Sequence, residues 1–242
     1  MSTIPVPATG AWASLDRLRA WFPWVGLLVG TIGGAVFLGA AALLPPACAA
    51  VVATGAWLLL TGGLHLDGVA DCGDGLGCQA SRERRLEIMK DPRVGAFGVC
   101  ALVLVLLGRF AAFLSIASGQ APHGWPASLR LLAACAFAAA SGRFMVLLVG
   151  MLPYARPAGM GAGLSAPLPV SRWVLALVPV VASGACVGLV PALAGLGAAL
   201  CGSALLACVS MRRLGGVTGD VAGATVEISE VLVLMVVPQL LS

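Results

Sequence analysis

The sequence predicts an all-α fold, a polytopic integral membrane helix bundle with six to seven transmembrane helices. Three observations support this fold class. Hydrophobic residues make up 60% of the 242 residues and charged residues only 10%, whereas soluble domains carry about 25% charged residues. The mean hydropathy is +1.03, and the apolar residues form long runs. The 32 glycines are typical of membrane helices that pack closely through small side chains.

The apolar runs divide into successive spans from the N-terminus onward. Residues 20–64 carry no charged side chain, which is enough for two spans of about 20 residues each, separated by a pair of prolines. Residues 173–211 are again long enough for two, with a turn predicted near Pro191 and Gly195. The final apolar segment, 231–241, crosses only if the few residues before it are added. The predicted spans are 24–44, 47–62, 97–117, 129–150, 173–190, 194–210 and 228–241.

Charge distribution predicts the orientation of these spans. With the N-terminus in the cytoplasm, the polar segments 64–95, 151–172 and 211–230 all fall on the cytoplasmic side together with nearly all basic residues. The opposite side keeps only Arg130, while Arg109 falls inside the third span. All ten acidic residues also lie on the cytoplasmic side. We therefore expect the functional face of the protein to be cytoplasmic.

Composition excludes several other classes of protein. The net charge of +4 comes from basic residues scattered between apolar runs, without the basic tail or stripe of a nucleic-acid-binding protein. Most of the eight cysteines lie in apolar runs, and Cys72 and Cys78 have no second pair, so no structural zinc site is expected. The N-terminus lacks a short apolar region followed by a cleavage site, so no cleavable signal peptide is expected.

The polar segment after the second span contains three aspartates. Asp67, Asp71 and Asp74 are spaced i, i+4 and i+7, which places their carboxylates on one face of a helix. Clustered carboxylates repel one another unless a cation lies among them, and hard oxygen ligands suit Mg²⁺ or Mn²⁺. We predict that the three aspartates are catalytic residues and metal ligands. The alternative is a solvated loop whose acids pair with the arginines that follow.

Basic residues follow the aspartates. Arginine and lysine beside metal-binding carboxylates commonly bind phosphate groups. Lys90 is predicted to be catalytic, and Arg82 and Arg93 to bind substrate. An ordinary amphipathic cytoplasmic helix or contact with lipid headgroups is the alternative, and for Arg82 it is equally well supported. His65, two residues before the aspartates, is a candidate catalytic residue or a hydrogen-bonded structural group.

A second acidic group occurs near the C-terminus. Asp220, Glu227 and Glu230 are spaced so that a helix beginning near Thr218 would align all three on one face. Asp220 and Glu227 are predicted to complete the metal site, a hypothesis that requires the two acidic segments to touch. Glu230 lies at or inside the last span, where an ionisable group is a functional candidate by default.

Two further arginines are candidate substrate-binding residues. Arg143 occurs in an otherwise apolar span and needs an acidic group or a phosphate as its partner. Arg156 lies between prolines and is followed by glycines, which indicates a loop folded over a ligand. Anchoring to lipid headgroups is the alternative for both.

Several motifs together resemble a known family. The sequences TGGLHLDGVADCGDGL, LEIMKDPRVGAFG, PYARPAGMGAG and GGVTGDVAGATVEISE, together with FPWVG before the first span, resemble cobalamin synthase, the adenosylcobinamide-GDP ribazoletransferase family, over nearly the full length. The departures are small: Cys72-Gly73 replaces the family's Thr-Ala, and Pro92 replaces Ser. The resemblance implies one membrane-embedded catalytic domain over residues 1–242, in the inner membrane of a bacterium.

The resemblance also implies the reaction and its partners. Adenosylcobinamide-GDP and α-ribazole, or α-ribazole 5′-phosphate, would give adenosylcobalamin, or its 5′-phosphate, and GMP, with Mg²⁺ as cofactor. A ribose hydroxyl would attack the phosphorus on the cobinamide side, and His65 or an aspartate would act as base. The lipid bilayer is a further partner and nucleic acid is not. The sequence leaves open whether the chain forms a homo-oligomer.

Two other functions are weighed against this interpretation. A membrane CDP-alcohol phosphotransferase also uses DG pairs, but Asp71 stands where that family has arginine, and Asp91 is the only later aspartate of the segment. A transporter could line a path with Arg109, Arg143 and Glu230. Against transport, the acids gather at one face and no repeat relates the two halves of the chain.

Overall fold

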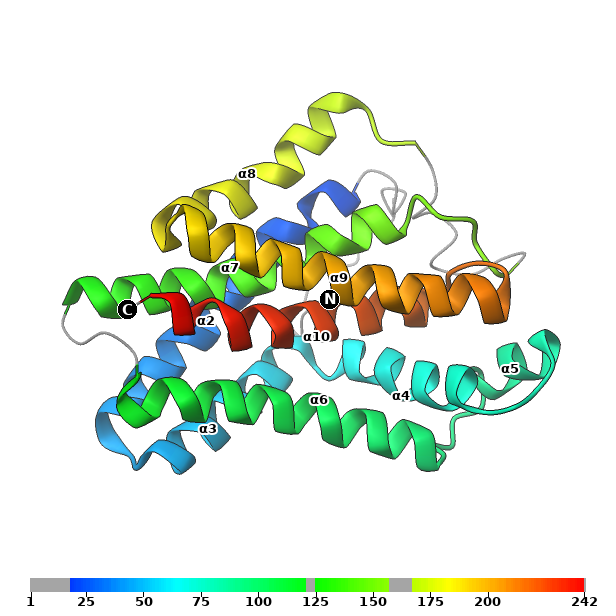
Figure 1. Cartoon of the computed structure of the whole chain (residues 1–242), viewed down its shortest axis with the longest axis horizontal. Coiled ribbons are helices and arrows are strands. Elements are labelled where there is room, and N and C mark those ends of the chain that lie inside the picture. The colour runs from blue at the N-terminus through cyan, green and yellow to red at the C-terminus, as the bar shows by residue number, and fades with distance from the viewer. Residues whose placement is uncertain (1–17, 121–124, 157–166, 242) are drawn as a thin grey trace, which may run out of the picture.

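The computed structural model describes residues 18–120, 125–156 and 167–241, and within these residues it is a bundle of helices (Figure 1). Most helices run along the long axis of the molecule. The helices are α2 (Phe22–Leu43), α3 (Pro46–Thr61), α4 (Leu64–Gly77), α5 (Arg82–Ile88), α6 (Ala96–Ser115), α7 (Trp125–Val149), α8 (Val170–Val187), α9 (Leu189–Leu214) and α10 (Gly219–Val236), with short turns η1 (Arg19–Trp21), η2 (Ile116–Gln120) and η4 (Pro238–Leu240).

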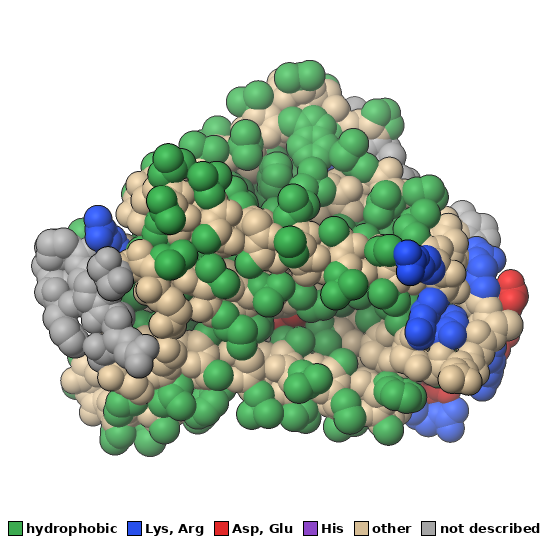
Figure 2. Space-filling model, in the orientation of Figure 1, with side chains coloured by type: hydrophobic (Ala, Val, Ile, Leu, Met, Phe, Trp, Pro, Cys, Tyr) green, Lys and Arg blue, Asp and Glu red, His purple; other side chains and the backbone are tan. Residues whose placement is uncertain are grey.

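Two helices form the centre of the bundle. The most apolar windows of α7 and α10 are 78% and 72% buried, compared with 22% for α6 and 28% for α9. The peripheral helices expose large apolar side chains such as Leu104, Val181 and Leu205. Figure 2 shows this hydrophobic surface across the middle of the molecule, while most Lys, Arg, Asp and Glu side chains in view gather at the end where α5 lies. An apolar waist with charge at one end is the surface expected of a membrane protein.

Close approach of α2 to α7 depends on glycine. A Cβ placed on Gly26 would lie 2.3 Å from the carbonyl oxygen of Ala139, and one on Gly30 would lie 2.3 Å from that of Cys135. Any larger side chain at either glycine would push the two helices apart. In lipid the hydrophobic effect does not drive helices together, so close van der Waals packing at small residues such as these stabilises the pair.

The predicted second span, 47–62, is only half of a broken span. Helix α3 has 16 residues, about 24 Å at 1.5 Å per residue and shorter than a hydrocarbon core of about 30 Å. The chain then bends by 94° and continues as α4. Gly62 and Gly63, with φ of 63° and 69°, form the bend, a conformation that other residues rarely adopt. The first part of the predicted polar segment 64–95 is therefore a packed helix.

The last span is longer than predicted. Residues Gly219–Leu240 form a 22-residue crossing, so most of the predicted cytoplasmic segment 211–230 lies within helices. Asp220, Glu227 and Glu230 lower the hydropathy of the first half of this helix, so the sequence predicted only its second half as a span. The predicted number of six to seven transmembrane helices is confirmed: six described helices are long and apolar enough to cross, and there are seven crossings if the bent pair of α3 and α4 forms one span.

The turn between the fifth and sixth predicted spans lies earlier than expected. Gly188, with φ of 109°, separates α8 from α9. Pro191 lies in the first turn of α9, where its missing N–H costs no hydrogen bond. Gly195 is inside α9, where a Cβ would lie 2.6 Å from the Val237 side chain. Gly195 therefore serves helix packing and Pro191 helix initiation, whereas Gly188 forms the turn.

Two connecting segments at the charged end pair with each other. Tyr154 and Val217 form a parallel β-bridge, in which the Ala155 N–H donates to the Val217 carbonyl at 2.8 Å and the Val217 N–H to the Pro153 carbonyl at 2.8 Å. This pairing brings the residues after α7 beside the start of α10. Residues 157–166 of the predicted segment 151–172 lie outside the described residues.

Candidate active site

The two acidic segments meet because α4 and α10 pack against each other in opposite directions. A Cβ on Gly68 would lie 2.5 Å from the Asp220 carbonyl oxygen, and one on Gly223 would lie 3.5 Å from the His65 backbone. The contact requires glycine at position 68 on α4, whereas a Cβ at position 223 on α10 would make an ordinary van der Waals contact. The hypothesis that the aspartates after α3 and the acids near the C-terminus share one region is confirmed for Asp220.

Four carboxylates gather at the charged end of this contact, and we call Asp67, Asp71, Asp74 and Asp220 the outer aspartate group. Asp67 is exposed and the other three are half-buried. The negative charges of Asp220, Asp67 and Asp74 act on Asp71, and the positive charge of Arg156 opposes them. The Arg156 guanidinium donates to Asp220 at 3.0 Å. One arginine leaves the group strongly negative, so it is suited to attract a cation.

Asp74 also has a structural role. Its two carboxylate oxygens accept hydrogen bonds from the Gly95 N–H at 2.7 Å and the Gly98 N–H at 2.8 Å. Both N–H groups belong to the start of α6, where helix N–H groups lack intrahelical partners. Asp74 thus joins the end of α4 to the beginning of α6. Its remaining lone pairs are the part available to a ligand.

The chemistry of the outer aspartate group fits Mg²⁺. Within the described residues, no three His, Cys, Asp or Glu side chains lie close enough to form a complete metal site. A complete protein cage is not required, because Mg²⁺ usually keeps several waters and binds one or two carboxylates together with substrate phosphates. Asp67 and Asp71, one helical turn apart, with Asp220 opposite, provide such carboxylates. Magnesium binding stays a prediction.

Three arginines near the group bind backbone carbonyls. Arg82 donates to the Leu214 carbonyl at 2.6 Å and to the Ala155 carbonyl at 2.8 Å. Arg85 is buried and donates to the Gly75 carbonyl at 2.9 Å, and Arg213 donates to the Leu76 carbonyl. These contacts satisfy carbonyls at the ends of α4 and α9. Arg82, predicted to bind substrate, instead joins three segments of the protein.

The connection between α5 and α6 carries the other predicted phosphate ligands. Lys90 is exposed at its start. Arg93 has a side chain that is 86% exposed and pairs with Asp91 at 2.7 Å. Hydrogen bonds from Arg93 hold the pKa of the Asp91 carboxyl well below its usual range. Both basic residues lie a few positions before Gly95, whose N–H binds Asp74 of the outer aspartate group.

A second polar group lies deeper in the bundle, and we call it the deep ionic group. It brings together one aromatic residue, one histidine, two arginines and two glutamates from five helices. All six side chains are buried, with exposed fractions of 5% or less. Its members are Trp57 on α3, His65 on α4, Arg109 on α6, Arg143 on α7, and Glu227 and Glu230 on α10.

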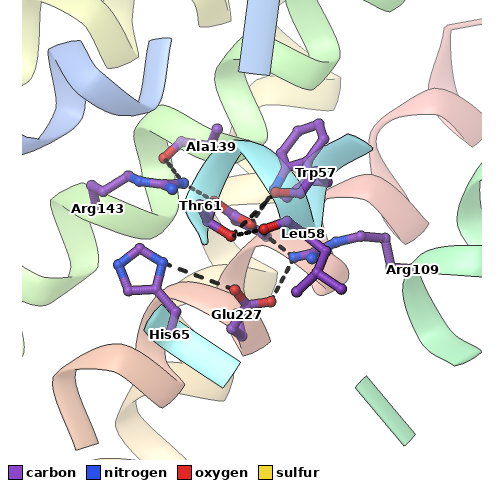
Figure 3. Close-up of polar contacts among 9 residues, drawn as sticks. Trp57, Leu58, Thr61, His65, Arg109, Ala139, Arg143 and Glu227 are labelled. Carbon is purple, nitrogen blue, oxygen red and sulfur yellow. Dashed lines mark hydrogen bonds and ion pairs between the residues drawn. The ribbon is translucent and has the colours of Figure 1, made fainter. Parts of the chain in front are cut away.

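Arg109 is the centre of the deep ionic group. It donates to Glu227 at 2.8 Å and to Glu230 at 2.8 Å, and its guanidinium carbon lies 5.4 Å from the centroid of the Trp57 ring. The Trp57 indole N–H donates to Glu230 at 2.7 Å. Figure 3 shows Glu227 between His65 and Arg109, with His65 Nδ1 3.9 Å from a Glu227 oxygen. These contacts link α3, α4, α6 and α10.

Two predicted site residues belong to this deep group. Arg143 was expected to pair with an acid or a phosphate, and the structure pairs it with the acid Glu230. Glu227 was expected to share a metal with Asp220; it contacts Arg109, and its metal role stays a prediction. The two arginines and the two glutamates of the group balance in formal charge. Trp57 was missed by the sequence analysis, because nothing in an apolar run marks a tryptophan as a partner of a glutamate.

The fold and the outer aspartate group define a polytopic helical membrane protein with an acidic site at its charged end. The cobalamin-5-phosphate synthase family matches residues 1–238, and the chain belongs to this family. It is 41% identical to an adenosylcobinamide-GDP ribazoletransferase of Azorhizobium caulinodans, over 97% of this chain and 90% of that protein. A protein of the same description from Pseudomonas savastanoi is 42% identical, over 91% and 87%. No solved structure matches the chain.

Proposed function

We propose that the chain joins adenosylcobinamide-GDP to α-ribazole, or to α-ribazole 5′-phosphate, releasing GMP. The relatives that match most of the chain carry this activity in their description, and the family describes cobalamin-5-phosphate synthesis. The observation that carries the proposal is the contact of α4 with α10, which gathers the outer aspartate group at the charged end of the bundle. The products are adenosylcobalamin, or its 5′-phosphate, and GMP.

The reaction exchanges one phosphorus–oxygen bond for another. A ribose hydroxyl attacks the phosphorus attached to the cobinamide side, the bond from that phosphorus to the bridging oxygen breaks, and GMP leaves with that oxygen. The hydroxyl proton passes to a base. Transfers of this kind depend mainly on in-line positioning and on neutralising the charge of the phosphoryl oxygens.

An aspartate of the outer group is better placed than His65 to accept the proton. His65 is 5% exposed and faces Glu227 in the interior, whereas Asp67 is exposed and Asp71 half-buried. A base must come within hydrogen-bond reach of the proton that it removes. Lys90 and Arg93, both exposed, would bind the pyrophosphate.

Asp71 and Asp220, which act on each other across the contact of α4 with α10, would hold Mg²⁺ together with substrate phosphate oxygens and water. When bound, the ion would neutralise charge on the phosphoryl oxygens and the leaving group. The protein supplies the negative field that attracts the cation and, through Arg156, limits the repulsion among the carboxylates.

The decisive experiment is a reconstituted assay. Purified protein in liposomes is incubated with adenosylcobinamide-GDP, α-ribazole and Mg²⁺, and GMP is quantified together with the corrinoid product. Stoichiometric GMP and product are expected, with neither formed when α-ribazole is omitted. Phospholipid product from a CDP-alcohol would contradict the proposal, as would solute movement across the vesicle without nucleotide release.

We also propose that the charged end faces the cytoplasm of a bacterial inner membrane. Basic residues gather at this end (Figure 2), as the positive-inside rule requires. In a cysteine-free background, an impermeant thiol reagent added outside spheroplasts should label Arg130→Cys and miss Arg84→Cys. Both positions are exposed, so equal labelling of the two would refute the orientation.

A further inference from the structure

Helix α4, which carries three residues of the outer aspartate group, has low intrinsic helix stability. Helix α4 has 14 residues, among them Gly68, Gly73, Gly75 and Gly77, and each interior glycine costs roughly 0.5–1 kcal/mol relative to alanine. It follows a 94° bend at two glycines. The position of Asp71 relative to Asp220 must therefore be set by contacts that α4 makes with other helices.

At its charged end α4 is held by several of these contacts. Arg85 and Arg213 bind the carbonyls of its last turn, and Asp74 binds the start of α6. None of these partners belongs to α10. They secure α4 to α5, α6 and α9, so they do not determine how far α4 slides along α10.

At the other end the deep ionic group holds both arms of the bend against α10. Trp57, five residues before Gly62, donates to Glu230, and His65, two residues after Gly63, faces Glu227. Arg109 binds both glutamates from α6. Glu227 lies two helical turns, about 10 Å, from Asp220 along α10. A shift of the bend relative to α10 would move Asp71 away from Asp220.

We propose that Trp57, Arg109, Glu227 and Glu230 are positioning residues for the outer aspartate group. They contact neither substrate nor metal. They fix the bent pair α3–α4 in one register on α10, and this register creates the carboxylate site. The inference rests on the proposed function where it is tested by the kinetics of GMP release. A second measurement, the affinity for Mn²⁺, does not need turnover.

The test compares Glu227→Gln with the matched control Ser229→Ala. Ser229 is equally buried on α10, but it contacts Ser203 on α9 at 3.0 Å and not α4. The first variant removes a buried negative charge from α10, and the second removes a buried hydrogen bond from the same helix. Thermal unfolding of the purified proteins measures the structural cost, GMP release measures kcat and KM, and an electron paramagnetic resonance titration with Mn²⁺ measures cation affinity.

Positioning predicts that Glu227→Gln lowers kcat and Mn²⁺ affinity by roughly 10- to 100-fold, as loss of groups that orient metal ligands does, in protein that remains folded at the assay temperature. The Ser229→Ala variant should keep both values within about twofold, because the hydrogen bond that it removes joins α10 to α9 and not to α4. Trp57→Phe is a milder variant that removes the hydrogen bond to Glu230. It replaces Glu227→Gln in the same measurements if that variant does not accumulate in the membrane.

The outcomes separate this inference from the proposed function. Unchanged kcat and Mn²⁺ affinity in folded Glu227→Gln, or in Trp57→Phe if that variant must stand in, would overturn the positioning role even if unfolding occurs at a lower temperature. Wild-type protein that binds Mn²⁺ but releases no GMP would refute the function alone. Weaker Mn²⁺ binding in the variant would then still support the positioning role.

Discussion

The outer aspartate group and the deep ionic group use the same kinds of side chain in opposite ways. In the outer group four carboxylates face one arginine and remain accessible. In the deep group two glutamates face two arginines and all are enclosed. An unbalanced, accessible set of charges is suited to attract a ligand. In the balanced, buried set the charges pair with one another, although several of its nitrogen and oxygen atoms have no hydrogen-bond partner within the described residues. The comparison leads us to expect ligand binding at the outer aspartate group, where the carboxylates outnumber their basic partners.

The sharpest test of this comparison is removal of one outer charge. Asp71→Asn keeps the size of the side chain and should lower GMP release by more than about 100-fold, the loss typical when one electrostatic contact to a reacting group is removed. The protein should still insert and accumulate in the membrane, because the carboxylate has only like charges and Arg156 acting on it. Activity within a few fold of the parent would show that the aspartates are not the site.

Removal of Arg109, the arginine that both deep glutamates share, should have the opposite signature. Arg109→Met leaves Glu227 and Glu230 buried without their shared partner, and breaking a buried pair in this way costs about 3–5 kcal/mol. Little folded protein should be recovered, as measured by membrane accumulation and thermal unfolding. The control Arg84→Met removes an exposed pair with Glu87, worth about 0–1 kcal/mol. Equal recovery of the two variants would contradict the contrast.

Asp220 belongs to the outer aspartate group, but it lies on α10, the helix that also carries the two glutamates of the deep ionic group. We expect Asp220→Asn to raise the Mg²⁺ concentration for half-maximal activity by about 10- to 100-fold, as for other groups that share an ion. A purely structural role would instead lower stability by about 0.3–1 kcal/mol, since Asp220 lies in the first turn of α10. Titration with Mg²⁺ and thermal unfolding of one preparation distinguish the two roles.

The smallest effect is expected outside both groups. Asp91 is partly exposed and bound to Arg93, and its lowered pKa keeps it charged throughout the neutral range. Asp91→Asn should change kcat by no more than about twofold, because exposed ion pairs contribute about 0–1 kcal/mol. A change in KM for adenosylcobinamide-GDP would show that Asp91 prepares Arg93 for substrate. Steady-state GMP release at several substrate concentrations makes the measurement.

The bundle could be predicted largely from hydropathy, and its two largest departures from the predicted spans have clear causes. A hydropathy argument detects apolar length, so it located α2, α6 and α7 within a few residues. It missed the bend at Gly62 and Gly63, because backbone conformation leaves no trace in hydropathy. It also shortened α10, where the cost of buried acids is offset by arginines from other helices.

The sequence by itself determined that three aspartates share one helical face and that most of the exposed charged residues lie at one end of the bundle. Both follow from local spacing and from the cost of charge in lipid. Only the tertiary structure decided which acids meet. Spacing placed Asp220 and Glu227 on one face of α10, but the former meets Asp71 on α4 and the latter Arg109 on α6. Periodicity gives the direction of a side chain around its helix, whereas its partner depends on which helix packs there and at what depth.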